Sequence, residues 1–390
     1  MDFEALINTS QAIYFPEKDD IVVNDDKQDF PTVHKNESGF FSSLFRDYFF
    51  TPLHDVYLHG GPGPMAHQKS IYRRFWFEEN QNCVYYGQVE EIKKQFDVYN
   101  QKIIIKESDG STITVSFRTY ETKSSENDDR PFTNLIVYGG SISTLDNNLG
   151  GNLSEGFCHV EKYLDSFRLR ILNFSVYDVT VTPPDGKPKY FKPHCLDDLG
   201  SVMGNILKAL HQKFGSVDGI ICHSLACIVF SKALEFLEPE QLDIIPKFVV
   251  LDRGTSSVKK ATRSSLFGDL ILAAAEYFGW SNQDELHICN YFNRCSKQQT
   301  LKDRDIWVIS VEDDTYFKDP TLDSCTLRYL EKLGIKVKNI ALKVPLDKSS
   351  IDAHHARPRN EIGPLFGNSV SDMILAQMYE NQKKIDQVHE

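Results

Sequence analysis

The 390-residue sequence contains eight cysteines and no Cys-x-x-Cys pair. A disulfide scaffold uses cysteines more densely, and a structural zinc site takes ligands from closely spaced pairs. Two of the cysteines, Cys222 and Cys227, fall in apolar sequence that is typical of a core. The pattern favours a reducing, cytoplasmic compartment and predicts no metal site.

The chain also lacks a long apolar run and a phosphate-binding loop. Its most apolar stretch, residues 270–280, is shorter than the roughly 20 residues that cross a bilayer, and it contains Glu276. The first residues, Met-Asp-Phe-Glu, are unlike a signal peptide. Neither Gly-x-x-x-x-Gly-Lys-Ser/Thr nor Gly-x-Gly-x-x-Gly occurs. We therefore expect a soluble protein without a nucleotide cofactor, with export by a non-classical secretion system left open.

Concentrated positive charge is absent too. The formal net charge is -12, and the basic clusters at residues 187–192 and 336–343 are short and interrupted. Phosphate backbones bind to concentrated positive charge, so nucleic acid is excluded as a partner. With 41% hydrophobic and 25% charged residues, the composition is that of a globular chain with one large domain.

The chain divides into three parts. Residues 1–97 are rich in aromatics without a long periodic element, which predicts an extension packed on the main domain. Residues 98–370 form the main domain, which opens with a hairpin of residues 102–106 and 112–118 around Ser-Asp-Gly. Residues 371–390 are expected to form a polar C-terminal helix or tail.

Strand-like and helical patterns alternate along the main domain. This alternation predicts an α/β fold with a mostly parallel central sheet and helices on both faces. Residues 254–302 interrupt it, which predicts a cap insertion. The expected strands are residues 135–138, 169–174, 217–222, 248–252, 306–311 and 335–344, and the expected helices are residues 197–214 and 226–237.

The most informative segment is Gly-Ile-Ile-Cys-His-Ser-Leu-Ala, residues 219–226. It puts Ser224 on a tight turn between a buried strand and an amphipathic helix, the context of a nucleophile elbow. The turn needs small residues two positions before and after the serine, and here these are Cys222 and Ala226, where glycine is usual. We therefore predict Ser224 as a nucleophile, with a structural serine or a helix N-cap as the alternative.

A serine hydroxyl needs a base to take its proton and a carboxylate to orient that base. The strand at residues 306–311 runs into carboxylates at its C-terminal end, where ligand sites lie in parallel sheets. We expect Asp314 to be the acid, with Asp313 as the close alternative. Asp252, which ends the preceding strand, is a third candidate.

The base is expected past the last strand, in the loop that contains His354 and His355. Adjacent side chains point in different directions, so only one should reach Ser224, and we favour His355 over His354. A surface histidine pair or a weak metal site is the alternative for this segment.

The oxyanion hole needs two amides. Leu225 at the start of the helix supplies one, and Ser141 after Gly139-Gly140 supplies the other, because glycines let a backbone approach the substrate. A rival string, His-Gly-Gly-Pro-Gly at residues 59–63, resembles the oxyanion motif of proline iminopeptidases. It precedes the hairpin, however, so a Gly/Pro turn is the better interpretation of it.

Residues 98–365 resemble the α/β-hydrolase superfamily in the order of elements, the Tyr-Gly-Gly-Ser loop, the elbow, and the Asp and His-His loops. The resemblance implies an acyl-enzyme mechanism with no metal and no organic cofactor. More narrowly, Val-Leu-Asp-Arg-Gly-Thr-Ser-Ser at residues 250–257, with Gly279-Trp280 beyond it, is similar to a branch of uncharacterised serine hydrolases. That branch includes the lipase-like secreted bacterial effectors called SidB.

The leading hypothesis is a serine hydrolase of carboxylic esters, above all lipid or lysophospholipid acyl esters, with peripheral membrane contact. A peptidase or thioesterase on the same triad is the second hypothesis, and the motif around Pro62 is its main support. The third is a catalytically silent α/β-hydrolase scaffold that binds a partner. It ranks last because the chain supplies a candidate for every triad member.

Overall fold

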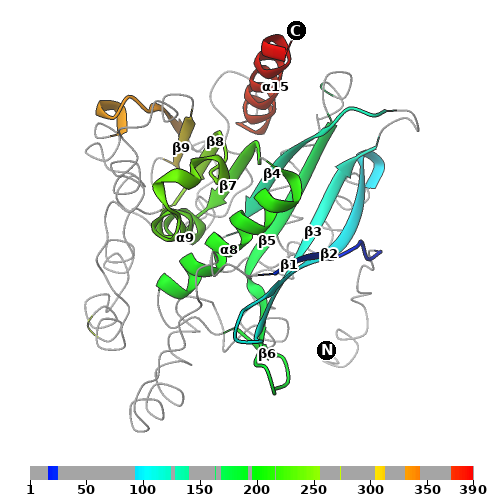
Figure 1. Cartoon of the computed structure of the whole chain (residues 1–390). Helices are drawn as coiled ribbons and strands as arrows, with labels where there is room; N and C mark the ends of the chain where they lie inside the picture. The colour runs from blue at the N-terminus through cyan, green and yellow to red at the C-terminus, as the bar shows by residue number, and fades with distance from the viewer. Residues whose placement is uncertain are drawn as a thin grey trace, which may run out of the picture.

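A central sheet organises the molecule (Figure 1). The computed structural model describes residues 16–24, 93–123, 128–139, 163, 168–191, 196–215, 217–254, 273, 304–311, 330–342 and 370–389. Within these residues the strand order is β1-β2-β3-β5-β4-β7-β8-β9-β10, with β6 paired to β5. The strands are β1 (Ile21–Asn24), β2 (Phe96–Lys106), β3 (Thr112–Thr122), β4 (Phe132–Tyr138), β5 (Arg168–Thr182), β6 (Lys189–Tyr190), β7 (Gly219–His223), β8 (Phe248–Asp252), β9 (Asp305–Val311) and β10 (Lys336–Leu342).

The sheet is mostly parallel. β3 runs antiparallel to both of its neighbours, β2 and β5, and the short β6 is antiparallel to β5. All other pairs in the order are parallel. The predicted α/β class is therefore confirmed, and the carboxyl ends of β4, β7, β8 and β9 lie at one edge of the sheet.

The predicted hairpin is confirmed and is longer than the sequence indicated. β2 and β3 pair over their whole length, from Phe96 opposite Thr122 to Lys106 opposite Thr112. Gly110 in the turn has φ 84°, a backbone conformation that glycine adopts without a steric penalty. Beside it, the amide of Ser111 donates to Asp109 Oδ1 at 2.8 Å.

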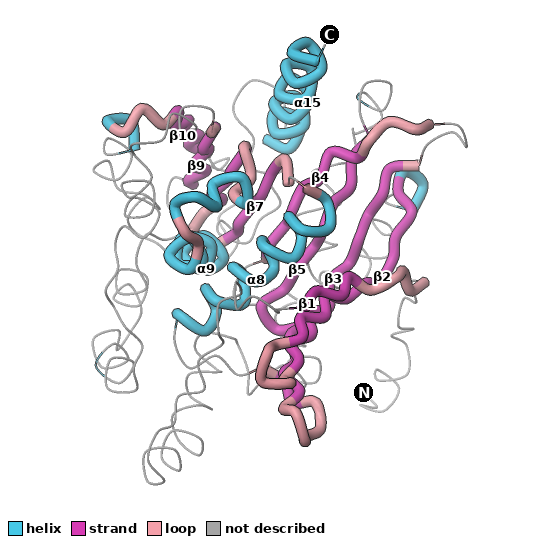
Figure 2. Tube along the Cα trace, in the orientation of Figure 1, coloured by secondary structure: helices cyan, strands magenta, loops and turns pink. Residues whose placement is uncertain are grey.

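Helices cover both faces of the sheet, as predicted, and Figure 2 shows the helices of one face in front of the strands. Successive residues of a strand point to opposite faces, so each buried strand contributes to two cores. Ile220 of β7 packs on the side of α8 (Leu196–Phe214) and α9 (Leu225–Ala233). Its neighbour Ile221 packs on the side of α15 (Val370–His389). Two 3-10 helices, η5 (Leu234–Phe236) and η6 (Pro239–Ile244), connect α9 to β8.

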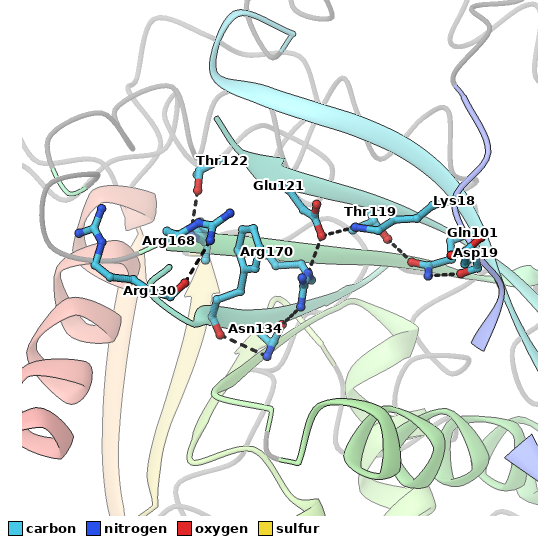
Figure 3. Close-up of polar contacts among 12 residues, drawn as sticks. Lys18, Asp19, Gln101, Thr119, Glu121, Thr122, Arg130, Asn134, Arg168 and Arg170 are labelled. Carbon is cyan, nitrogen blue, oxygen red and sulfur yellow. Dashed lines mark hydrogen bonds and ion pairs between the residues drawn. The ribbon is translucent and has the colours of Figure 1, made fainter. Parts of the chain in front are cut away.

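Strand β1 was not predicted, and it adds a parallel edge strand in the register of Ile21 opposite Ile103. Side chains fix this register (Figure 3). Lys18 forms an ion pair with Glu121 of β3 at 2.5 Å. The Gln101 amide donates to the carbonyl of Asp19 at 2.6 Å. The N-terminal segment is thus attached to the hairpin through its backbone and its charged groups.

Candidate active site

Ser224 lies between the end of β7 and the start of α9, where the sequence predicted an elbow. Its backbone has φ 56° and ψ -122°, the conformation of the first central residue in a type II′ turn. Glycine is the usual occupant of that position, and another residue held there costs about 1–3 kcal/mol. Strain of this kind persists only when the surrounding structure holds it, and it is concentrated at functional sites.

The residues around Ser224 explain how the turn is accommodated. Cys222 and Ala226, two positions away on either side, are small and fully buried. The amide of Ser224 donates to the carbonyl of Asp252 at 3.0 Å, so the end of β8 anchors the turn. The Ser224 carbonyl accepts from the amide of Cys227 at 3.1 Å, which closes the first turn of the helix.

The alternative role as a helix N-cap does not fit. The Ser224 side chain makes no capping hydrogen bond to α9, and its φ is positive, whereas N-cap residues adopt β-region backbone angles. The residue is 8% exposed. Leu225 follows as the first residue of α9. Its amide therefore stands at the positive end of the helix dipole, as the predicted oxyanion donor requires.

Asp252 and Arg253 form an ion pair beneath the elbow, and both side chains are 0% exposed. Arg253 Nε lies 2.8 Å from Asp252 Oδ1, and Arg253 Nη2 lies 3.0 Å from Oδ2. Both carboxylate oxygens of Asp252 thus accept from a guanidinium in a bidentate arrangement. The sequence named Asp252 as a third candidate for the triad acid, but it did not reveal this pairing, because an Asp-Arg pair at a strand end is also typical of a solvated turn.

The two cysteines near Ser224 are buried and belong to the core. Burial raises the pKa of both the Cys222 and the Cys227 thiols well above the usual value. The Cys227 thiol donates to the carbonyl of Cys222 at 3.1 Å. A nucleophilic cysteine needs a lowered pKa, so these thiols act as small core groups.

The other predicted site residues lie outside the described residues. These are the acids Asp313 and Asp314, the histidines His354 and His355, and the oxyanion donor Ser141, together with the rival motif at residues 59–63. The cap insertion lies outside as well, apart from Gly254 and residue 273. Of the predicted constellation, the structure brings together Ser224 and Leu225.

Sheet topology fixes where the strands that precede two of these segments end. Tyr138, the last residue of β4, pairs with Cys222, so β4 ends beside the strand that leads into the elbow. Ile309 of β9 pairs with Asp252, and Val311 ends that strand two residues later. The described ends of β4 and β9 therefore lie at the sheet edge on which Ser224 lies.

None of the described helices is long and apolar enough to cross a membrane. The described stretches also hold no group of three or more histidine, cysteine or acidic side chains placed to bind a metal ion.

Comparison with known proteins found no matching family model. No curated protein matches the sequence. Among solved structures, an α/β-hydrolase from Vibrio vulnificus is 13% identical, with a TM-score of 0.42 over 86% of this chain and 92% of that one. A fungal esterase from Rhizomucor miehei is 15% identical, with a TM-score of 0.40 over 80% and 92%. Est1E from Butyrivibrio proteoclasticus is 9% identical, with a TM-score of 0.38 over 71% and 96%.

Proposed function

We propose that the protein is a serine hydrolase that cleaves carboxylic esters through an acyl-enzyme intermediate on Ser224. The observation that carries the proposal is the positive φ of Ser224 on a turn between a buried parallel strand and a helix. A structural serine gains nothing from this strained conformation. A nucleophile does gain, because the turn lifts the hydroxyl out of the strand and sets it at a helix N-terminus.

The proposed reaction runs in two steps. Ser224 Oγ attacks the ester carbonyl carbon while its proton passes to His355, or to His354, and Asp314 or Asp313 orients the imidazole. The amides of Leu225 and Ser141 stabilise the negative charge on the carbonyl oxygen. The alcohol leaves with the proton that the histidine holds. Water then attacks the acyl carbon while the histidine takes its proton, the bond to Ser224 Oγ breaks as the histidine returns that proton to Oγ, and the acid is released.

The sheet supports this assignment of partners. The carboxyl ends of β4, β7 and β9 share one edge, and the segments with Ser141 and with Asp313-Asp314 begin immediately past β4 and β9. The order hairpin, oxyanion strand, nucleophile strand and acid strand is also the order that the α/β-hydrolase resemblance implies. Within that class, we propose an apolar acyl ester of the lipid or lysophospholipid kind as the substrate.

A serine-reactive fluorophosphonate tests the nucleophile. We expect labelling of the wild type and none of Ser224→Ala. Ser231→Ala is the matched control, because Ser231 lies on the same helix and its hydroxyl donates to the carbonyl of Cys227 at 2.9 Å. Absence of labelling in a folded wild type, or equal labelling of Ser224→Ala, would refute the proposal.

A second experiment tests the substrate class. The wild type is assayed with acyl esters of one alcohol and increasing chain length, in parallel with N-terminal proline amides. The lipid proposal predicts that kcat/KM rises with chain length and that Ser224→Ala abolishes it. Faster cleavage of the proline amides would replace the lipid proposal with a peptidase.

A further inference from the structure

Residues 252–254, at the end of the strand that neighbours β7, are arranged unusually. Asp252 ends β8, and the ion pair it forms with Arg253 is completely removed from solvent. Taking two charges out of water costs several kcal/mol for each ion, and an apolar pair of the same size is often at least as stable. The buried ion pair is therefore poorly explained by a contribution to the stability of the fold alone.

Backbone contacts connect this segment to both sides of Ser224. The carbonyl of Asp252 accepts from the Ser224 amide at 3.0 Å. A Cβ atom on Gly254 would lie 3.0 Å from the Ser224 carbonyl oxygen and 2.1 Å from Cys227 Sγ. Residues 252–254 thus pack closely against the Ser224 turn, and there is no room for a side chain at residue 254.

The backbone φ angles also connect Arg253 with Ser224. Among the described residues, Ser224 with φ 56° and Arg253 with φ 48° are the non-glycine residues with positive φ. They follow the ends of neighbouring strands, and the Arg253 amide donates to the carbonyl of Ile309 in the next strand at 2.8 Å. Each strained residue needs surroundings that hold it, and here the two strained turns are hydrogen-bonded to each other through Asp252.

We propose that Arg253 is a positioning residue for Ser224. Its guanidinium fixes the Asp252 carboxylate, and the pair thereby fixes the peptide whose carbonyl holds the Ser224 amide. The conformation of the strained turn is therefore fixed before substrate binds. The Ser224 hydroxyl and the Leu225 amide are then already in their reactive positions. This proposal rests on the proposed function of Ser224, because it names a residue that prepares the same nucleophile.

Three variants test the proposal. Asp252→Asn/Arg253→Met removes both charges, so neither is left buried without its partner. Arg253→Lys keeps the charge but lacks the fork that binds both oxygens, and it serves if the double variant does not fold. Asp197→Asn is the control, because it breaks the 2.6 Å ion pair with Lys232 of α9, about two helical turns beyond Ser224.

We expect the double variant to lose about 10- to 100-fold in fluorophosphonate labelling rate and in kcat, the scale that a misplaced catalytic group produces, with KM changed less than about threefold. Arg253→Lys should recover part of the labelling rate. Amide exchange in peptides covering residues 222–227 should accelerate in the double variant. Asp197→Asn should leave the labelling rate and this exchange unchanged.

The outcomes separate the two proposals. If the folded variants label and exchange as the wild type does, the role of Arg253 is wrong and the nucleophile stands. A rise in KM at constant kcat would assign Arg253 to substrate binding and would also overturn the positioning role. If the wild type does not label but exchange accelerates in the double variant, Arg253 holds the turn and the hydrolase function is wrong.

Discussion

At the scale of single residues, Ser224 offers a measurement of strain that is independent of chemistry. Glycine is normally less stable than alanine because it is more flexible in the unfolded chain. At φ 56° and ψ -122° the glycine variant should be more stable than the alanine variant. Alanine keeps the steric conflict between Cβ and the backbone, whereas glycine has no Cβ. We expect Ser224→Gly to be about 1–2 kcal/mol more stable than Ser224→Ala by urea denaturation, with both inactive. A more stable alanine variant would show that the turn is not strained.

Gly254 offers a second residue-scale prediction. A methyl group there would meet Cys227 Sγ at 2.1 Å, so the contact between residue 254 and the first turn of α9 must open. We expect Gly254→Ala to lower the fluorophosphonate labelling rate by about 100-fold, since displacement of a catalytic group by 1 Å has such an effect. Gly186→Ala is the control, because its new methyl group would meet Pro183 at 3.0 Å in a surface turn. Wild-type labelling of the Gly254 variant would contradict the tight fit.

At the scale of elements, the attachment of β1 predicts a pH dependence. Burial opposes the charged form of Glu121, but hydrogen bonds from Lys18 and Arg170 outweigh it and hold the pKa of this carboxyl below its usual range. The unfolded chain therefore takes up a proton first as pH falls. The resulting stabilisation is complete above the ordinary pKa of about 4.3 and is lost as pH falls through the lowered value.

The variant Glu121→Gln tests this account. We expect it to lose about 1.5–3 kcal/mol of unfolding free energy at pH 7, the range for a hydrogen bond to a charged group. It should also show a shallower decline of stability below pH 4 than the wild type. Thermal unfolding across pH measures both effects. Glu331→Gln, at an exposed position, is the control and should follow the wild-type curve. Parallel curves for wild type and Glu121→Gln would contradict the role of the ion pair.

The elements that sequence could predict are those with local signals. The hairpin, α8 and the β7–α9 unit each carry periodic apolar residues and a turn signal, and each was found close to its predicted range. β1 has four residues in polar surroundings, and its pairing depends on a partner 82 positions away, as in the bond between Gln101 and Asp19. The continuation of β5 past residue 174 likewise depends on its pairing with β3.

The same distinction applies to the site. The spacing of small residues around Ser224 is local, and it predicted the elbow. The role of Arg253 depends on three strand ends meeting, and an arginine after an aspartate gives no sign of full burial. The burial of Arg253 can be predicted only when the neighbours of β8 are known. These are β7, which leads to Ser224, and β9, which contains Ile309.

At the scale of the whole molecule, the sheet separates the site from the C-terminal helix. Ser224 follows the carboxyl end of β7, whereas Gln377 of α15 donates to Asp305, the first residue of β9, at 3.4 Å. The apolar side of α15 is buried against the sheet through Ile374, Leu375 and Met378. This helix therefore completes one of the two cores at the sheet edge away from the elbow, and it should contribute to stability and not to reactivity.

Leu375→Ala tests that separation. Leu375 is 0% exposed, and removal of a buried leucine side chain costs about 2–5 kcal/mol of unfolding free energy. We expect a loss in this range by urea denaturation, while the labelling rate per folded molecule at Ser224 stays at the wild-type value. Val22→Ala is the control for an apolar truncation, because Val22 is 54% exposed and should change stability by less than about 0.5 kcal/mol. A labelling rate that falls together with stability in Leu375→Ala would mean that the second core supports the nucleophile directly, and the two edges of the sheet would then be coupled through β7 and β9.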